Sequence, residues 1–105
     1  MEGEFPKWYS KMREQYKEYF TALDGLRERV RNQGPLDEKT SHLIQLAAAA
    51  AIHSEGSVHS HARRALKAGA TPEEIYHAII LLTSTLGFPT TSAALSWVYD
   101  ICEKK

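Results

Sequence analysis

Four of the five histidines lie between His42 and His61, and this segment holds the residues best suited to acid/base chemistry. Imidazole titrates near neutral pH, so it can both accept and donate a proton. His42 and His53 are eleven residues apart, a spacing that returns to nearly the same face of one helix. Ser57 and His61 are four residues apart and share a face of the next helix. A helix-turn-helix would bring these faces together, which makes His42, Ser57 and His61 candidate catalytic residues.

Three other interpretations of this segment stay open. Ser57 would be a nucleophile activated by His61 only if a third group oriented the histidine and an oxyanion hole were present. His42, His53 and His61 would bind a metal through neutral imidazole, but no recognised ligand spacing supports this. Ser54 is better explained as a helix cap than as a catalytic group. We therefore expect neither a metal nor a cofactor.

Cys102 is the single cysteine of the chain, so an internal disulfide or a Cys-x-x-Cys centre is impossible. The segment 54–61 of the chain therefore cannot carry two-thiol redox chemistry.

The lone cysteine and an acidic N-terminus, where a secretory signal would be basic, predict a cytoplasmic protein. The formal net charge of +0 gives no reason to expect nucleic acid or membrane partners. The longest uncharged apolar run, 46–52, is too short to span a bilayer.

A long amphipathic helix is predicted from about Phe5 to Val30, because its apolar residues are one, three or four positions apart. They are Phe5, Trp8, Tyr9, Met12, Tyr16, Tyr19, Phe20, Leu23, Leu26 and Val30. Gly25 could bend this helix. A straight helix of roughly 26 residues would be about 39 Å long, whereas a compact chain of this size has a radius of gyration near 13 Å. The apolar face would extend beyond one subunit, which favours a homo-oligomer. The alternative is a kink near Gly25 that folds the apolar face into the subunit's own core.

Four further helices are expected at about 38–53, 55–68, 72–86 and 90–103. Asp37 and Ser54 are good N-caps, and Thr71 with Glu74 forms a capping box around Pro72. The alanine run at 47–51 predicts a central, buried helix. No strand pattern of useful length occurs. The sequence therefore predicts a single all-α domain over residues 1–105 with about five helices.

Several motifs resemble those of the carboxymuconolactone decarboxylase family, which includes the alkylhydroperoxidase D-like proteins. They are LDEKT at 36–40, the alanine-rich helix, SEGSVHSH at 54–61, ALKAGATPEEI at 65–75, and GFP at 87–89 before an alanine-containing helix. The resemblance covers about residues 36–101 and leaves 1–33 outside it as an N-terminal amphipathic helix. It implies an alkylhydroperoxidase D-like helical bundle that assembles as a trimer or hexamer.

The peroxidase-like branch of this family has a glutamate on the alanine-rich helix, then Cys-x-x-Cys, then a histidine four residues later. By this resemblance His42 stands at the glutamate position, Ser54 and Ser57 at the two cysteine positions, and His61 at the histidine position. Only His61 is retained. A helix-start thiolate attacks peroxide or disulfide, and a serine hydroxyl has no such chemistry. Thiol peroxidase activity is therefore disfavoured, although a family label would suggest it.

The decarboxylase-like branch also lacks the cysteine pair and keeps a histidine at the position of His61. This resemblance implies a cofactor-free lyase that acts on a small carboxylated lactone or keto acid. His61 would be the general acid/base, His42 would assist, and Arg63 or Arg64 would be candidate clamps for the carboxylate. The alternative is a non-catalytic oligomer that binds a small molecule or persists as a degenerate family member.

Overall fold

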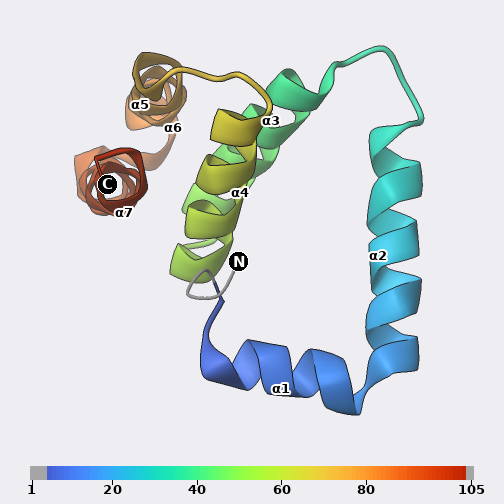
Figure 1. Ribbon diagram of the computed structural model, residues 1–105. Helices are drawn as coiled ribbons and strands as arrows, with labels where there is room; N and C mark the ends of the chain where they lie inside the picture. The colour runs from blue at the N-terminus through green and yellow to red at the C-terminus, as the bar shows by residue number, and fades with distance from the viewer. Residues whose placement is uncertain (1–4, 104–105) are drawn as a thin grey trace. The chain divides into compact units, whose positions relative to one another are not determined.

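The computed structural model describes residues 5–103, and all regular elements in that range are helices (Figure 1). They are α1 (Lys7–Gln15), α2 (Lys17–Arg31), α3 (Glu38–Ala51), α4 (Glu55–Lys67), α5 (Pro72–Ile80), α6 (Thr83–Leu86) and α7 (Phe88–Cys102). The all-α prediction is confirmed. The expected number of about five helices is too low, because six described helices have nine or more residues and α6 adds a single turn. No described helix is both long enough and apolar enough to cross a membrane.

The chain forms two compact units, one ending at Pro35 and the other beginning at Leu36. In the first, the single helix expected over residues 5–30 is two helices, with the break at Tyr16 (φ −120°, ψ 60°). Gly25, the expected bend, lies inside α2. Figure 1 shows the sharp corner between α1 and α2.

Arg13 on α1 explains why the chain turns at this corner. Its guanidinium forms an ion pair with Asp24 on α2 and lies 4.8 Å from the ring centroid of Phe20. Phe20 also packs edge-on against Tyr9 of α1, with ring centroids 5.7 Å apart. These contacts between residues of α1 and α2 require the two helices to fold towards each other, which a straight helix would prevent.

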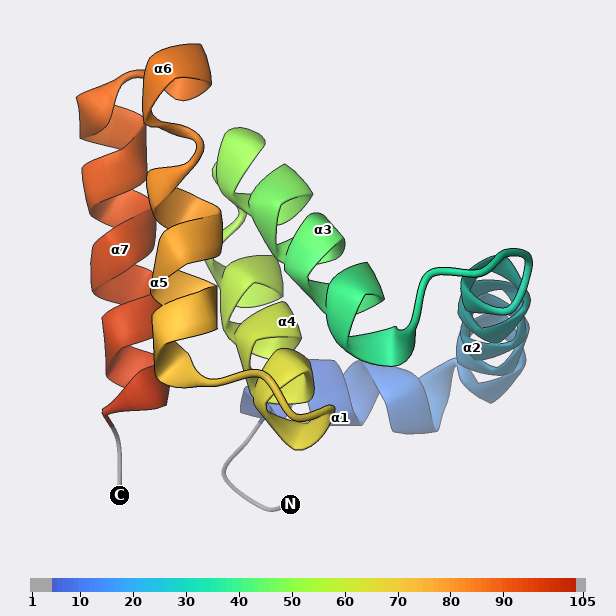
Figure 2. The same cartoon turned by 90° about the horizontal axis from the view of Figure 1, so that it is seen from above.

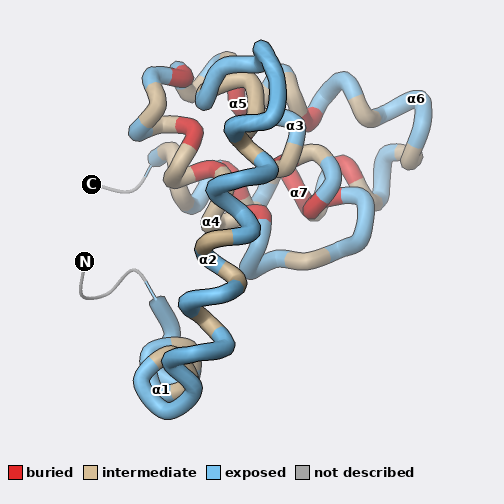
Figure 3. The backbone as a smooth tube through the Cα atoms, turned by 90° about the vertical axis from the view of Figure 1, so that its right-hand side faces the viewer, coloured by how far each residue is buried: buried red, intermediate tan, exposed pale blue. Residues whose placement is uncertain are grey.

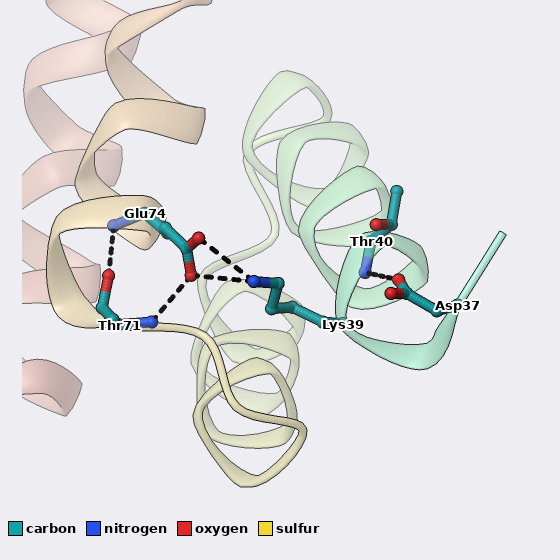
Figure 4. A network of polar contacts seen from close by, with 5 residues as sticks. All are labelled: Asp37, Lys39, Thr40, Thr71 and Glu74. Carbon is teal, nitrogen blue, oxygen red and sulfur yellow. Dashed lines mark hydrogen bonds and ion pairs between the residues drawn. The ribbon is translucent and has the colours of Figure 1, made fainter.

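In the second unit, the predicted starts of α3, α4 and α5 are confirmed. The Asp37 carboxylate accepts a hydrogen bond from the Thr40 main-chain N–H at 2.8 Å. Thr71 and Glu74 form the predicted capping box of α5. Glu74 also accepts hydrogen bonds from the Lys39 ammonium at 3.1 and 3.3 Å, which joins α5 to the start of α3 (Figure 4).

The hydrophobic core lies among α3, α4, α5 and α7, where Figure 3 shows most of the buried positions. Its largest fully buried apolar side chains are Leu46, Val58, Ile75, Ile79 and Val98. Alanines of α3, α4 and α7 complete this core, and their small side chains allow the helix backbones to approach closely. Figure 2 shows α5 beside α7 and α3 beside α4, which matches the packing of these pairs.

The alanine-rich helix α3 packs against α4, α5 and α7, as expected of a central helix, but it is buried on one face only. Leu46, Ala49 and Ala50 are buried, whereas Ala48 and Ala51 are exposed. Alanine propensity favours a helix in either environment, and therefore does not by itself indicate burial.

The fourth predicted helix also differs, because α5 ends at Ile80 and α6 is a separate single turn ending at Leu86. Gly87 then has a φ of 88°, a conformation that suits glycine. Phe88 and Pro89 begin α7 rather than preceding it. Proline fits the first turn of a helix, since the N–H groups there have no partner within the helix.

Candidate functional site

His42 and His61 lie side by side on two neighbouring helices of the second unit. His42 is on α3 and His61 is on α4, and their Nδ1 atoms are 3.3 Å apart. The ring centroids are 5.5 Å apart and the ring planes are tilted by 35°. The two residues therefore approach each other as predicted, because the turn after α3 folds α4 back against α3.

The two imidazoles differ in their exposure to solvent. His42 is 2% exposed, whereas His61 is half-buried. A buried polar ring needs hydrogen-bonding partners, since leaving it unpaired costs free energy. The 3.3 Å contact supplies one partner for His42, and the half-buried His61 is the better placed of the two to meet a solvent-borne molecule.

Glu38 is a member of this cluster that the sequence reasoning missed. Its carboxylate oxygen lies 4.0 Å from Nε2 of His42, one helical turn later in α3. The side chain of Glu38 is 71% exposed, so the carboxylate reaches the buried ring from the solvent side. The four-residue spacing of an acid before a histidine on one helix was the signal that could have found it.

His53 does not join the histidine pair in the way its spacing suggests. Helix α3 ends at Ala51, and His53 lies in the following turn, exposed and with a φ of 61°. The eleven-residue spacing from His42 therefore does not act as helical spacing. Among residues 5–103, no group of three or more His, Cys, Asp or Glu side chains is arranged to hold a metal ion. His42, His53 and His61 thus form no metal-binding group in the described chain.

Ser54 and Ser57 occupy the start of α4. The Ser54 hydroxyl accepts a hydrogen bond from the Ser57 main-chain N–H at 3.4 Å, which is the expected N-cap geometry. Ser57 is exposed and lies one turn before His61 on the same side of α4. Ser54 thus has a structural role, and Ser57 is near His61 by its position on the helix.

Arg63 and Arg64, the candidate clamps, are both half-buried residues of α4. Side chains three residues apart on a helix are neighbours, and side chains two apart are not. Arg64 therefore lies on the same side of α4 as His61, and Arg63 does not.

Cys102 is half-buried at the end of α7. Burial raises the pKa of its thiol, and this effect outweighs the lowering effect of a hydrogen bond with Tyr76. The pKa of Tyr76 is raised as well. Its causes are desolvation and the hydrogen bond that the Tyr76 hydroxyl donates to Glu103 at 2.8 Å. Since the thiolate is the reactive form, this environment makes Cys102 a poor nucleophile.

We expect the thiol of Cys102 to react more slowly with iodoacetamide at pH 8 in the folded protein than in the urea-unfolded chain. The raised pKa leaves less thiolate in the folded state, and burial hinders access. Mass spectrometry of timed, acid-quenched samples measures the two rates. Faster alkylation of the folded protein would contradict this assignment and would reopen thiol chemistry at Cys102.

Helices α3, α4, α5 and α7 pack into one all-α unit, and the histidine pair lies between α3 and α4. A sequence model of the carboxymuconolactone decarboxylase family matches residues 17–100, which is most of the chain. The chain belongs to this family. The match begins at the start of α2, earlier than the expected residue 36, so it includes a helix that the resemblance had left outside.

A solved structure supports the same assignment. The chain is similar to the apo crystal structure of a carboxymuconolactone decarboxylase family protein from Legionella pneumophila, with 27% sequence identity and a TM-score of 0.79. The similarity covers 91% of this chain and 86% of that one. A search among curated protein sequences found no significant match.

Proposed function

We propose that this protein is a cofactor-free acid/base enzyme that acts on a small carboxylated lactone or keto acid. The observation that carries the proposal is the contact between His42 and His61, whose Nδ1 atoms are 3.3 Å apart. A half-buried imidazole held by a buried one is suited to proton transfer, because its orientation is restrained while it is still partly exposed to solvent. Membership of the carboxymuconolactone decarboxylase family supports this class of reaction.

His61 is the proposed general acid/base. In a decarboxylation, the bond to the carboxyl carbon breaks and its electron pair is delocalised into the neighbouring carbonyl as an enolate. The His61 imidazolium then donates a proton to the carbon that lost CO₂, and water restores the proton to His61. Arg64, on the same side of α4, would bind the carboxylate, and Ser57 would lie near the substrate.

A panel of 3-oxo acids and carboxylated lactones tests the proposal. Proton NMR would follow substrate loss in buffer containing EDTA, with a bicarbonate assay to detect released CO₂. Turnover of at least one compound, dependent on His61, supports the proposal. If the protein binds these compounds but converts none of them, the result would favour the non-catalytic alternative.

That alternative, a small-molecule-binding family member without catalysis, has one observation in its favour. The family resemblance assigns a reactive cysteine to the position of Ser54. In this protein the Ser54 hydroxyl caps helix α4 instead. Such a protein would bind its ligand equally well after His61→Ala, as measured by isothermal titration calorimetry. Loss of both binding and turnover in this variant would argue against it.

We also propose that the protein is a homo-oligomer, a trimer or hexamer as the family resemblance implies. Helices α1 and α2 contain no buried residue, and Trp8, Tyr19 and Val30 are each 64% exposed. An apolar surface of this kind is rarely left in water, and a second copy of the chain would cover it.

Light scattering coupled to size-exclusion chromatography is expected to give three or six times the mass of the 11.8 kDa chain. Replacing Tyr19 by glutamate should lower the assembly state, because it places a charge on the apolar surface. The matched control is Glu18→Gln, which removes a charge from the adjacent exposed position. A monomeric mass across a wide concentration range would contradict the proposal.

A further inference from the structure

Helix α7 has an outer face that lacks charge until the last turn of the helix. Charged residues make up 25% of the chain, yet no Asp, Glu, Lys or Arg occurs from residue 78 to residue 99. The inner face of α7 is buried in the core, and its exposed residues before Asp100 are Phe88, Pro89, Ser92, Ser96 and Tyr99. A surface helix ordinarily has charged residues on its solvent side. Their absence here is typical of the core of a protein–protein interface.

Four residues on this side of α7 have the spacing of a helix–helix seam. Phe88, Ser92, Leu95 and Tyr99 are four, three and four positions apart, which keeps their side chains on one stripe of the helix. Phe88 is 64% exposed, Tyr99 is 58% exposed, and Leu95 is half-buried. Figure 2 shows α7 along an edge of the second unit, with α5 beside it. We refer to these four residues as the α7 seam.

The α7 seam is complementary to itself when the α7 helix of a second copy lies antiparallel to it. A pairing centred between residues 93 and 94 places Phe88 opposite Tyr99 of the second copy. The same pairing places Ser92 opposite Leu95 of the second copy, so the small side chain leaves room for the large one. Parallel pairing would instead set serine against serine and leave a void, which close packing disfavours.

We propose that the α7 seam docks a second copy of this chain, with the two α7 helices antiparallel and related by a twofold axis. Because the seam has no charge, a charged partner would be desolvated without gaining an ion pair, whereas a second copy presents the same uncharged surface. The inference rests on the homo-oligomer proposed above. A hexamer built from two trimers requires a twofold contact, and the α7 seam supplies that contact.

The variant Ser92→Arg tests the seam by placing a charge at an exposed position in its middle, where pairing would desolvate it. Light scattering coupled to size-exclusion chromatography should give half the wild-type mass, as when a hexamer separates into trimers. Ser84→Arg is the matched control, because Ser84 is an exposed residue of α6 outside the seam. The control should keep the wild-type mass, and both variants should keep the wild-type circular dichroism spectrum.

The masses also separate this inference from the proposed homo-oligomer. A twofold contact joins chains in pairs, so the wild type must contain an even number of chains. A wild-type trimer would overturn the α7 seam and leave the homo-oligomer standing, whereas a wild-type monomer would overturn both. An unchanged mass for folded Ser92→Arg would also overturn the seam alone.

Disulfide trapping tests the antiparallel direction. Two proteins would be made with Cys102→Ser, one carrying Phe88→Cys and the other Tyr99→Cys, then refolded together from urea and oxidised with diamide. Mass spectrometry should find a linked pair with one chain of each kind. Neither protein should form this link alone, because antiparallel pairing separates identical positions by about 16 Å along the helix axis. Links in each protein alone, or no link in the assembled mixture, would overturn the antiparallel seam.

Discussion

Replacing His61 by alanine is expected to lower turnover of a carboxylated substrate by about 10²- to 10⁴-fold, the usual contribution of a positioned acid/base group. His61 is the half-buried member of the histidine pair, and the variant removes the group that would donate and accept the proton. The substrate contacts proposed for Arg64 remain, so the loss should fall on kcat more than on KM. Steady-state kinetics on the first compound that the wild type converts would measure both parameters.

His77→Ala is the control for this prediction, because His77 is an exposed histidine on α5, a different helix from either member of the pair. It should keep wild-type kinetics. Circular dichroism and the thermal midpoint of His61→Ala must match the wild type for the comparison to hold. Turnover by folded His61→Ala that equals that of the wild type would remove His61 from the mechanism.

The substitution Ile79→Ala is expected to lower the free energy of unfolding by about 2–5 kcal/mol, the usual range for truncating a buried isoleucine. Ile79 is 0% exposed and belongs to the core that α5 forms with α3, α4 and α7. Truncation removes apolar contacts and leaves a cavity that the close packing of the alanine-rich helices cannot fill without strain. Urea unfolding followed by circular dichroism measures the change.

Ile80→Ala provides a control on the same helix, because Ile80 is the next residue and is 51% exposed. Its effect should stay within about 0.5 kcal/mol. Both variants should be measured at several protein concentrations, since dissociation of an oligomer would make the midpoint depend on concentration. Equal losses in the free energy of unfolding for Ile79→Ala and Ile80→Ala would contradict the assignment of Ile79 to the core and Ile80 to the surface.

Helix starts were the most predictable part of the fold. Asp37, Ser54 and Thr71 all cap helices as expected, because a cap depends on hydrogen bonds between residues three positions apart. Helix interruptions were less predictable. The break at Tyr16 depends on contacts of Arg13 with Asp24 and Phe20, eleven and seven residues away, and the local sequence contains no glycine or proline to mark it.

The candidate site was predictable in part. His42 and His61 were singled out by type and spacing, and α3 and α4 do bring them together. Spacing failed for His53, because the helix ended two residues before it. Glu38 was missed although its spacing from His42 is local. Its closeness to the His42 ring became visible only from the interatomic distances.

The sequence by itself determined the all-helical class, the starts of α3, α4 and α5, and the absence of two-thiol chemistry from the segment 54–61. These properties depend on residue types, counts and spacings of a few positions, which are the same in any fold. Only the tertiary structure decided that α3 is buried on one face and that His42 and His61 meet through their Nδ1 atoms. It also decided that burial at the end of α7 raises the pKa of Cys102. Burial and ring orientation depend on helices distant in sequence, and no local pattern encodes where those helices pack.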